Sequence, residues 1–339
     1  MKSTGGKKRK WVDVAKKRIL NILTQRRVCS RTQLETKISE SGPTYMRPEP
    51  IFITQALKEL SREDIIVKLE DKNQNLPPFF AHSTFDPDNQ KDKDRLELIK
   101  KLYNKYKTLA SKVNNCGNIL EIVVYESARE CNSFVISGAP GNPPHLINGH
   151  NFQEIGWPEY VFMFSATTKP ISSIVECKNI RKWLYPESHE IWELLNKACK
   201  AEMVPILITR KIAHPVRFLF KSIGAIGFEM HRQYFSPHLK EEMEDIVHKD
   251  KLGFHNIYFS LEKEDRLINF FDNTVRKQID ILQATFLSVK DTLVDYAEEL
   301  SNVKLPSYKR IQIYREVFKE FVRPEWKEEY KDQIPDEYL

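Results

Sequence analysis

In the first eighty residues, apolar positions recur every three or four residues, which is the spacing of one face of a helix. Such a stripe at residues 19–23 predicts a first helix, and Ser30 is a favourable N-cap for a second, short helix over residues 31–38. A segment punctuated by glycine and proline at 41–50 precedes a third predicted helix at 51–60. Two runs rich in β-branched and aromatic residues then predict strands at 65–70 and 78–83, around a turn at 71–77.

Beyond residue 95 the pattern changes to strands that alternate with helices, which is typical of an α/β core. Each apolar strand is short and is bounded by turn residues or by a segment of helical period. Residues 261–339 have a helical pattern throughout. The elements expected between these limits are helices 96–113 and 119–131, strand 133–137, strand 159–164, turn 165–170, strand 171–178, helix 188–202 and strand 204–210.

Composition places the chain among ordinary globular proteins, with 41 % hydrophobic and 29 % charged residues. No apolar run approaches the roughly 18 residues that a membrane-spanning helix needs, and the basic N-terminus lacks the apolar stretch of a secretory signal. The five cysteines are scattered without a Cys-x-x-Cys pair, so we expect reduced thiols in the core. A cytoplasmic protein without a membrane partner is the expectation.

Positive charge is concentrated at the N-terminus. Residues 1–27 hold ten lysines and arginines against one acid, Asp13, although the whole chain carries a net charge of only +6. Such a run is either a solvated helix face or a patch that attracts phosphates. On the second interpretation Lys8, Arg9 and Lys10 are candidates for DNA contact.

Three helices followed by a two-stranded hairpin, over residues 1–83, resemble the winged-helix family of DNA-binding domains. The resemblance rests on the order of elements. It implies that the third helix enters the major groove and that Gln55, Lys58 and Arg62 contact DNA. A winged helix used for protein contacts is the alternative.

Candidate chemistry lies at the end of the strand ISSIVECK, residues 171–178. Side chains two residues apart in a strand lie on one face, so Glu176 and Lys178 point together and Cys177 points away. The short connection to strand 159–164 predicts a hairpin that brings Glu159 beside Glu176. Two adjacent carboxylates repel each other unless a cation lies between them, and Mg²⁺ is the natural occupant.

Pro158-Glu159, sixteen intervening residues and then Glu176-Cys177-Lys178 resemble the motif of the PD-(D/E)XK nuclease superfamily. The resemblance covers residues 117–211. It implies that Glu159 and Glu176 hold Mg²⁺, with Mn²⁺ as a substitute, and that Lys178 assists hydrolysis. Many members carry a further glutamate on the preceding helix, and Glu121 occupies that position here.

The first acid of the family motif is usually aspartate, and this chain has Glu159 there. A second alignment matches the run Gln153-Glu154-Ile155-Gly156 to a common Glu-Ile-Asp pattern, with Gly156 where the aspartate would stand. On that alignment the main ligand is missing, and either Glu154 substitutes for it or the site is inactive.

Together these resemblances imply an α/β, restriction-endonuclease-like mixed sheet flanked by helices, preceded by a winged-helix domain and followed by a helical C-terminal region. The expected boundaries are 1–83 for the winged helix, 84–94 for a linker, 95–260 for the nuclease domain and 261–339 for the C-terminal helices.

The implied function is that of a Mg²⁺-dependent DNA endonuclease of a restriction or other defence system. Arg181 and Lys182 follow the motif and are candidates for binding the phosphates of double-stranded DNA. A homodimer is one way to supply the two active sites that cutting both strands requires. The alternatives are a repair or recombination nuclease and a non-catalytic DNA-binding regulator built on a degenerate nuclease core.

Overall fold

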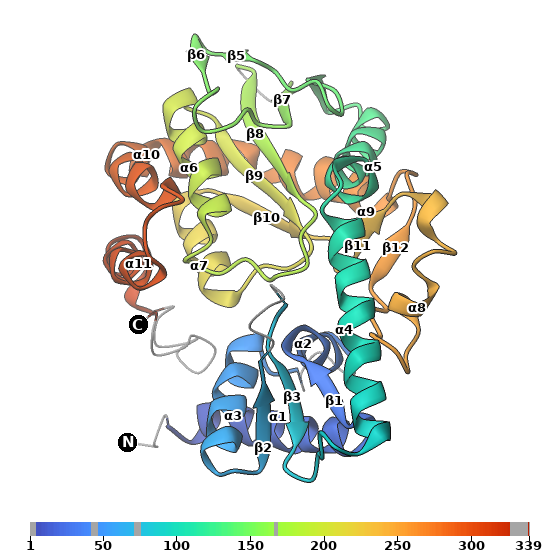
Figure 1. The fold of residues 1–339 in the computed structure, drawn as a ribbon. Helices are drawn as coiled ribbons and strands as arrows, with labels where there is room; N and C mark the ends of the chain where they lie inside the picture. The colour runs from blue at the N-terminus through green and yellow to red at the C-terminus, as the bar shows by residue number, and fades with distance from the viewer. Residues whose placement is uncertain (1–4, 42–46, 71–75, 166–168, 326–337, 339) are drawn as a thin grey trace. The chain divides into compact units, whose positions relative to one another are not determined.

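The computed structural model describes the whole chain except residues 1–4, 42–46, 71–75, 166–168, 326–337 and 339. The described chain forms two compact units. Unit 1 consists of Met1–Ser111 together with His238–Ile257, and unit 2 consists of Lys112–Pro237 together with Tyr258–Leu339. Both units contain helices and strands, so the protein is a mixed α/β protein (Figure 1).

Unit 1 combines helices with a small antiparallel sheet, in which β3 lies between β1 and β2. The first three helices and this sheet contribute to an apolar cluster in its core. The elements are α1 (Gly5–Arg26), β1 (Val28–Ser30), α2 (Arg31–Ser39), α3 (Pro50–Arg62), β2 (Ile66–Leu69), β3 (Phe79–His82), α4 (Gln90–Ala110) and α8 (Glu244–Val247).

The predicted starts of α2 and α3 have clear local causes. Ser30 caps α2 through a capping box, in which its hydroxyl accepts from the Gln33 backbone N–H and the Gln33 side chain accepts from the Ser30 N–H. Pro50 occupies the first turn of α3, where its missing N–H costs nothing. The sequence prediction for these two helices is confirmed to within a few residues.

Two expected connections lie partly outside the described residues, namely the loop at 41–50 and the turn at 71–77. The expected linker at 84–94 contains the beginning of α4, because the side chain of Asn89 caps this helix by accepting from the Lys91 N–H. Strand β1 was not expected from the sequence. Its three residues pair with β3 and are all buried.

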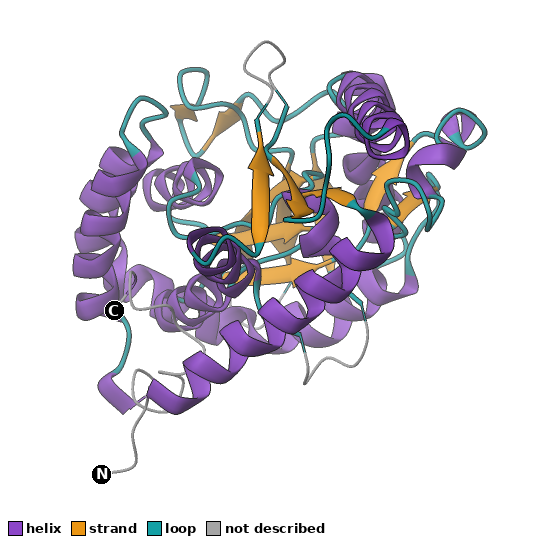
Figure 2. Ribbon diagram, turned by 60° about the horizontal axis from the view of Figure 1, so that its bottom comes forward, coloured by secondary structure: helices purple, strands orange, loops and turns teal. Residues whose placement is uncertain are grey.

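Unit 2 is built around a mixed five-stranded sheet of order β10-β9-β8-β7-β4. The three strands β8, β9 and β10 run parallel, whereas β7 is antiparallel to both of its neighbours. In Figure 2 the strands of this sheet are drawn in orange between purple helices. The strands are β4 (Phe134–Ser137), β7 (Tyr160–Phe164), β8 (Ile171–Lys178), β9 (Val204–Thr209) and β10 (Ile226–Glu229).

Helices lie on both faces of this sheet. Helices α6 (His189–Ala201) and α7 (His214–Ile223) connect consecutive parallel strands, as a parallel sheet requires. The other face is covered by an apolar cluster that includes residues of α5 (Asn118–Arg129), α9 (Asp265–Asn269) and the π-helical segment η4 (Phe270–Val275).

The remaining elements are η2 (Val113–Gly117), β5 (Leu146–Ile147), β6 (His150–Asn151), β11 (Gln233–Phe235), α10 (Arg276–Ser301) and α11 (Ser307–Phe321), with η3 (Pro237–Leu239) and β12 (Ile257–Phe259) where the chain passes between units.

The alternation of strands and helices expected from the sequence is confirmed, and β8 has the predicted bounds. The turn at 165–170 lies partly outside the described residues. All five cysteines are buried as free thiols, as expected. Among the described residues, no helix combines the length and the apolar character that crossing a bilayer requires.

Candidate active site at the end of strand β8

Three charged side chains meet where β7 and β8 lie side by side. The pairing of Tyr160 with Val175 continues toward Glu159 and Glu176, which brings the two glutamates to neighbouring positions. The Lys178 Nζ lies 2.7 Å from Glu176 Oε2 and 3.7 Å from Glu159 Oε1. The other oxygen of Glu159 accepts a hydrogen bond of 3.0 Å from the backbone N–H of Cys177.

Glu176 is the most buried member of this group, with no exposed surface. Besides Lys178, it forms an ion pair with Lys197 of α6, whose side chain is only 2 % exposed. A buried carboxylate is tolerated only when it is paired and hydrogen-bonded. The two ammonium groups therefore determine whether Glu176 can be charged at this position.

Lys197 was missed by the sequence analysis. It lies on a helix whose apolar positions, such as Trp192 and Leu195, have the spacing of a buried face, and it falls within that face. The only local sign of a buried ion pair is that a lysine occurs where the helical spacing predicts a buried residue. Burial lowers the pKa of Lys197 to about 8, and the charge of Glu159 acts in the opposite direction.

Lys178 stays protonated at neutral pH in this environment. Burial by itself lowers the pKa of its ammonium group, but the carboxylate of Glu159 and, on α6, those of Glu193 and Glu190 outweigh this effect and raise the pKa. The ammonium group is thus a fixed positive charge, suited to stabilising negative charge and poorly suited to accepting a proton.

Glu121 approaches the same group from α5. Burial, followed by the charge of Glu159, raises the pKa of its carboxyl group to about 7, and Lys178 acts in the opposite direction. The Tyr160 hydroxyl donates a 2.9 Å hydrogen bond to the backbone oxygen of Glu121, which ties α5 to β7. Of the four residues predicted to form the site, Glu121 therefore interacts electrostatically with Glu159 and Lys178, and Lys178 in turn pairs with Glu176.

Asn179 and Gly138 hold the backbone around these side chains. Asn179 follows β8 directly, and its amide nitrogen donates to the backbone oxygens of Cys116 and Tyr234, at 2.6 and 2.7 Å. Gly138 has a φ of +99°, and a Cβ there would lie 2.7 Å from the backbone oxygen of Glu159. A side chain at position 138 would therefore displace the strand that carries Glu159.

Of the two sequence alignments, the one through Glu159 is consistent with this geometry. Glu159 contacts Lys178 and the backbone of Cys177. Glu154 lies in an exposed turn before β7, and Gly156 has a φ of +81° with open space where a Cβ would lie.

Metal binding requires donors that are not already neutralised. Among the described residues, no three acidic, cysteine or histidine side chains form a ready-made metal site. Glu121 and Glu159 nevertheless suit a hard divalent cation. The charge of Glu159 raises the pKa of Glu121, and a cation between the two carboxylates would relieve this repulsion. Glu176 suits it less well, since two ammonium groups already neutralise it.

The residues predicted to contact DNA from α3 lie on one exposed face of unit 1. Gln55, Lys58 and Arg62 are exposed and are separated by three and four positions, which aligns them on a helix. The Gln55 amide donates to Glu59 at 3.2 Å. An acidic neighbour therefore lies beside this basic face.

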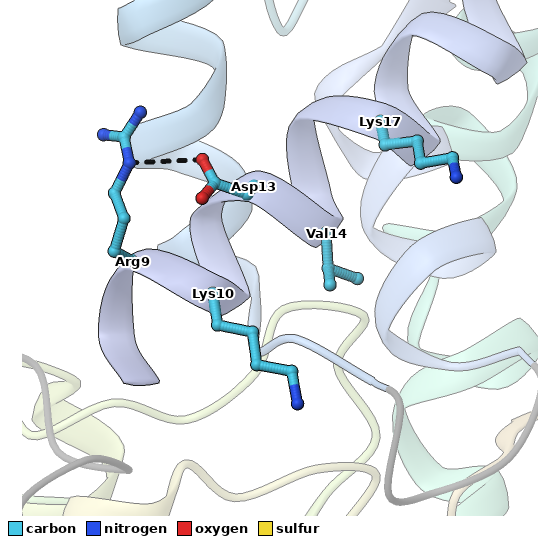
Figure 3. A pocket seen from close by; sticks show the side chains of 5 residues that line it. All are labelled: Arg9, Lys10, Asp13, Val14 and Lys17. Carbon is cyan, nitrogen blue, oxygen red and sulfur yellow. Dashed lines mark ion pairs between the residues drawn. The ribbon is translucent and has the colours of Figure 1, made fainter. Parts of the chain in front are cut away.

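On α1, an open cavity of about 440 Å³ is lined by Arg9, Lys10, Asp13, Val14 and Lys17 (Figure 3). Arg9 forms ion pairs with Asp13 at 3.2 Å and with Glu59 of α3 at 2.9 Å, so its charge is largely balanced. Lys10 is exposed. Lys8 belongs to α1, but its side chain lies outside the described part of the chain.

Arg181 and Lys182 differ in their surroundings. Arg181 is 9 % exposed, and its guanidinium donates to the Gln233 side chain at 3.4 Å, so in this structure it does not present its charge to solvent. Lys182 is exposed and forms a 2.8 Å ion pair with Glu190 at the start of α6. Of the two, only Lys182 is available to a phosphate without rearrangement of the core.

Compared with models of protein families, with curated proteins and with solved structures, the chain has no match in any of the three comparisons.

Replacing Lys197 with methionine should destabilise unit 2 by about 3 kcal/mol, because it leaves Glu176 buried with one ammonium group instead of two. Urea denaturation followed by circular dichroism measures this change. The control Lys200→Met removes a lysine of the same helix that pairs with the exposed Glu298, and should cost less than about 1 kcal/mol. Equal stability of the two variants would show that the buried pair does not hold Glu176.

Proposed function

We propose that the protein is a Mg²⁺-dependent DNA endonuclease with a PD-(D/E)XK site in unit 2 and a winged-helix-like DNA-binding module in unit 1. The observation that carries the proposal is the meeting of Glu121, Glu159, Glu176 and Lys178 at the end of β8. These residues come from α5, from the position just before β7 and from β8, in the order expected from the resemblance. The sheet, with parallel β8, β9 and β10 and antiparallel β7, is consistent with the proposed nuclease fold.

In this proposal Glu121 and Glu159 hold the metal ion, with Glu176 as a further ligand if one of its ammonium partners moves away. The bound ion supplies an activated water and neutralises charge on the phosphate. Lys178 contributes a fixed positive charge next to the scissile phosphate. Lys197 keeps Glu176 in place while Lys178 is engaged with substrate.

Unit 1 would bring this site to double-stranded DNA. Three helices followed by a strand pair support the winged-helix resemblance, and the exposed face of α3 supplies Gln55, Lys58 and Arg62. Lys10 on α1 and Lys182 in unit 2 would add phosphate contacts. A restriction or defence role, in which a homodimer cuts both strands, is the biological setting that the resemblance favours.

A second candidate function is a non-catalytic DNA-binding regulator on a degenerate nuclease core. One observation favours it: Glu176 already forms ion pairs with two lysines. DNA cleavage assays separate the two candidates.

Purified protein with Mg²⁺ should nick or linearise supercoiled plasmid. Lys178→Met and Glu159→Gln should lower the cleavage rate at least about 100-fold while DNA binding in EDTA persists, because Glu159 would hold the metal ion and Lys178 would act at the phosphate. Lys169→Met, an exposed lysine before β8, should cut like wild type. If wild-type protein binds plasmid but cuts with neither Mg²⁺ nor Mn²⁺, the regulator is the correct candidate, and unchanged rates in both variants would overturn the site.

The DNA-binding face of α3 is tested by salt dependence. Replacing Lys58 or Arg62 with alanine should weaken binding to duplex DNA and reduce the slope of log affinity against log salt by about 1 if each contacts one phosphate. Fluorescence anisotropy over a series of salt concentrations measures both quantities. Lys101→Ala, at an exposed position of α4, is the control. If Lys58→Ala and Arg62→Ala have the same affinity and salt slope as this control, α3 is excluded as the DNA-contacting helix.

Metal binding should show a pH dependence that depends on Glu121. Its folded-state pKa of about 7 lies above the ordinary 4.5, so its contribution to stability is complete below pH 4.5 and is lost as the pH rises through 7. Mg²⁺ binds the ionised carboxylates, so it should raise the melting temperature more at pH 8 than at pH 5.

The variant Glu121→Gln should be more stable than wild type at pH 8 without metal, and Mg²⁺ should stabilise it less. Glu126→Gln removes a half-buried carboxylate of the same helix that pairs with Arg129, and it should leave the response to Mg²⁺ unchanged. Differential scanning calorimetry measures all of these shifts. An identical response of wild type and Glu121→Gln to Mg²⁺ would remove Glu121 from the metal site.

A further inference from the structure

Three cations converge in unit 1, on elements that are distant in sequence. Arg26 ends α1, Lys37 lies in the last turn of α2 and Arg95 lies in the second turn of α4, and all three are partly buried. Each acts electrostatically on the same buried thiol, that of Cys29 in β1. Their positive charges are therefore gathered around one point of the unit.

The cluster borders a cavity of about 390 Å³, a volume typical of small-molecule sites. Lining residues come from the end of α1, from the start of α4 and from the segment between α8 and the end of unit 1. They are Gln25, Arg26, Arg27, Lys91, Arg95 and Asp250. The cavity thus lies within unit 1 and is lined mainly by cationic side chains.

Few acids balance these cations. Asp92 is occupied by Arg27, with which it forms hydrogen bonds of 2.8 and 2.6 Å. Asp250 lies 3.6 Å from the Arg26 guanidinium, but its side chain is 68 % exposed, so solvent weakens the attraction. The positive charge facing the cavity therefore exceeds the negative charge.

Two donors of the cluster remain without an acceptor. Arg26 Nη1 and Arg95 Nε are buried and have no hydrogen-bond partner among the residues that the structure describes. Leaving a buried donor unsatisfied is costly, and more so when it carries charge. Burial and the neighbouring Arg26 both lower the pKa of Lys37, which reflects the same lack of negative charge.

We propose that this cavity is an oxyanion site that binds a phosphate group through Arg26 and Arg95, which line it, with the charge of the neighbouring Lys37 adding to the attraction. A phosphate offers several acceptor oxygens and a negative charge, which would satisfy the two donors and reduce the repulsion among the cations. The group is either a free phosphate compound or a phosphate of the DNA backbone. The site belongs to unit 1, and phosphate binding there does not depend on nuclease activity.

Isothermal titration calorimetry of the full-length protein with inorganic phosphate, at constant ionic strength, tests the proposal. Wild type should bind one phosphate saturably, and Arg95→Gln and Lys37→Gln should each weaken binding by about tenfold or more. Lys93→Gln removes an exposed lysine of the same helix and should bind like wild type. Absence of saturable binding by wild type, or equal affinity in all variants, would overturn the proposal.

Thermal stability distinguishes a ligand site from a purely structural cluster. In phosphate-free buffer Arg95→Gln should melt at the same temperature as wild type or higher, because it relieves repulsion among the cations of the cluster. Added phosphate should raise the melting temperature of wild type and not that of the variant. A structural role for Arg95 predicts a lower melting temperature in phosphate-free buffer and an unchanged response to phosphate, and this result would contradict the site.

A duplex oligonucleotide identifies the source of the phosphate. If the site takes a backbone phosphate, duplex DNA should displace inorganic phosphate, and Arg95→Gln should lower the salt dependence of DNA binding. If it takes a free phosphate compound, DNA and phosphate should bind independently. Either outcome leaves the oxyanion site in place, and neither depends on whether the protein cleaves DNA.

Discussion

The candidate site depends on a carboxylate that has been removed from water. Glu176 has no exposed surface, and it is held between Lys178 of its own strand and Lys197 of α6. Isolated burial of such a charge would cost several kcal/mol, so the strand and the helix can pack together only with both ammonium groups near it. The ion pair of Glu176 with Lys197 links α6 to β8, and the alternation of β8 directs Lys178 to the same face as Glu176.

Around Glu176 the sheet brings together a carboxyl group that resists ionisation and an ammonium group that stays charged. Burial and the charge of Glu159 raise the pKa of Glu121, whereas the carboxylates around Lys178 outweigh the effect of its burial and raise the pKa of its ammonium group. Perturbed pKa values in neighbouring groups are a feature of reactive sites that structural ion-pair networks share. The same charges suit a divalent cation and a phosphate, and this is the physical basis of the proposed nuclease function.

Local patterns predicted much of the fold. The period of two in β8 placed Glu176 and Lys178 on one face, and the capping residue Ser30 marked the start of α2. Lys197 was not predictable, because helical periodicity indicates a buried face but not which residue of that face meets the sheet. The joining of 238–257 to the N-terminal unit depends likewise on contacts distant in sequence, which no local pattern encodes. The family resemblance and the DNA contacts remain predictions.

The most direct test of the central claim is anomalous diffraction from crystals of the protein soaked with Mn²⁺. We expect one strong peak within ligand distance of the Glu121 and Glu159 carboxylates, with Lys197 still paired to Glu176. No peak at that position, with both lysines still bound to Glu176 at saturating Mn²⁺, would contradict the metal site and leave the end of β8 as a structural ion-pair network.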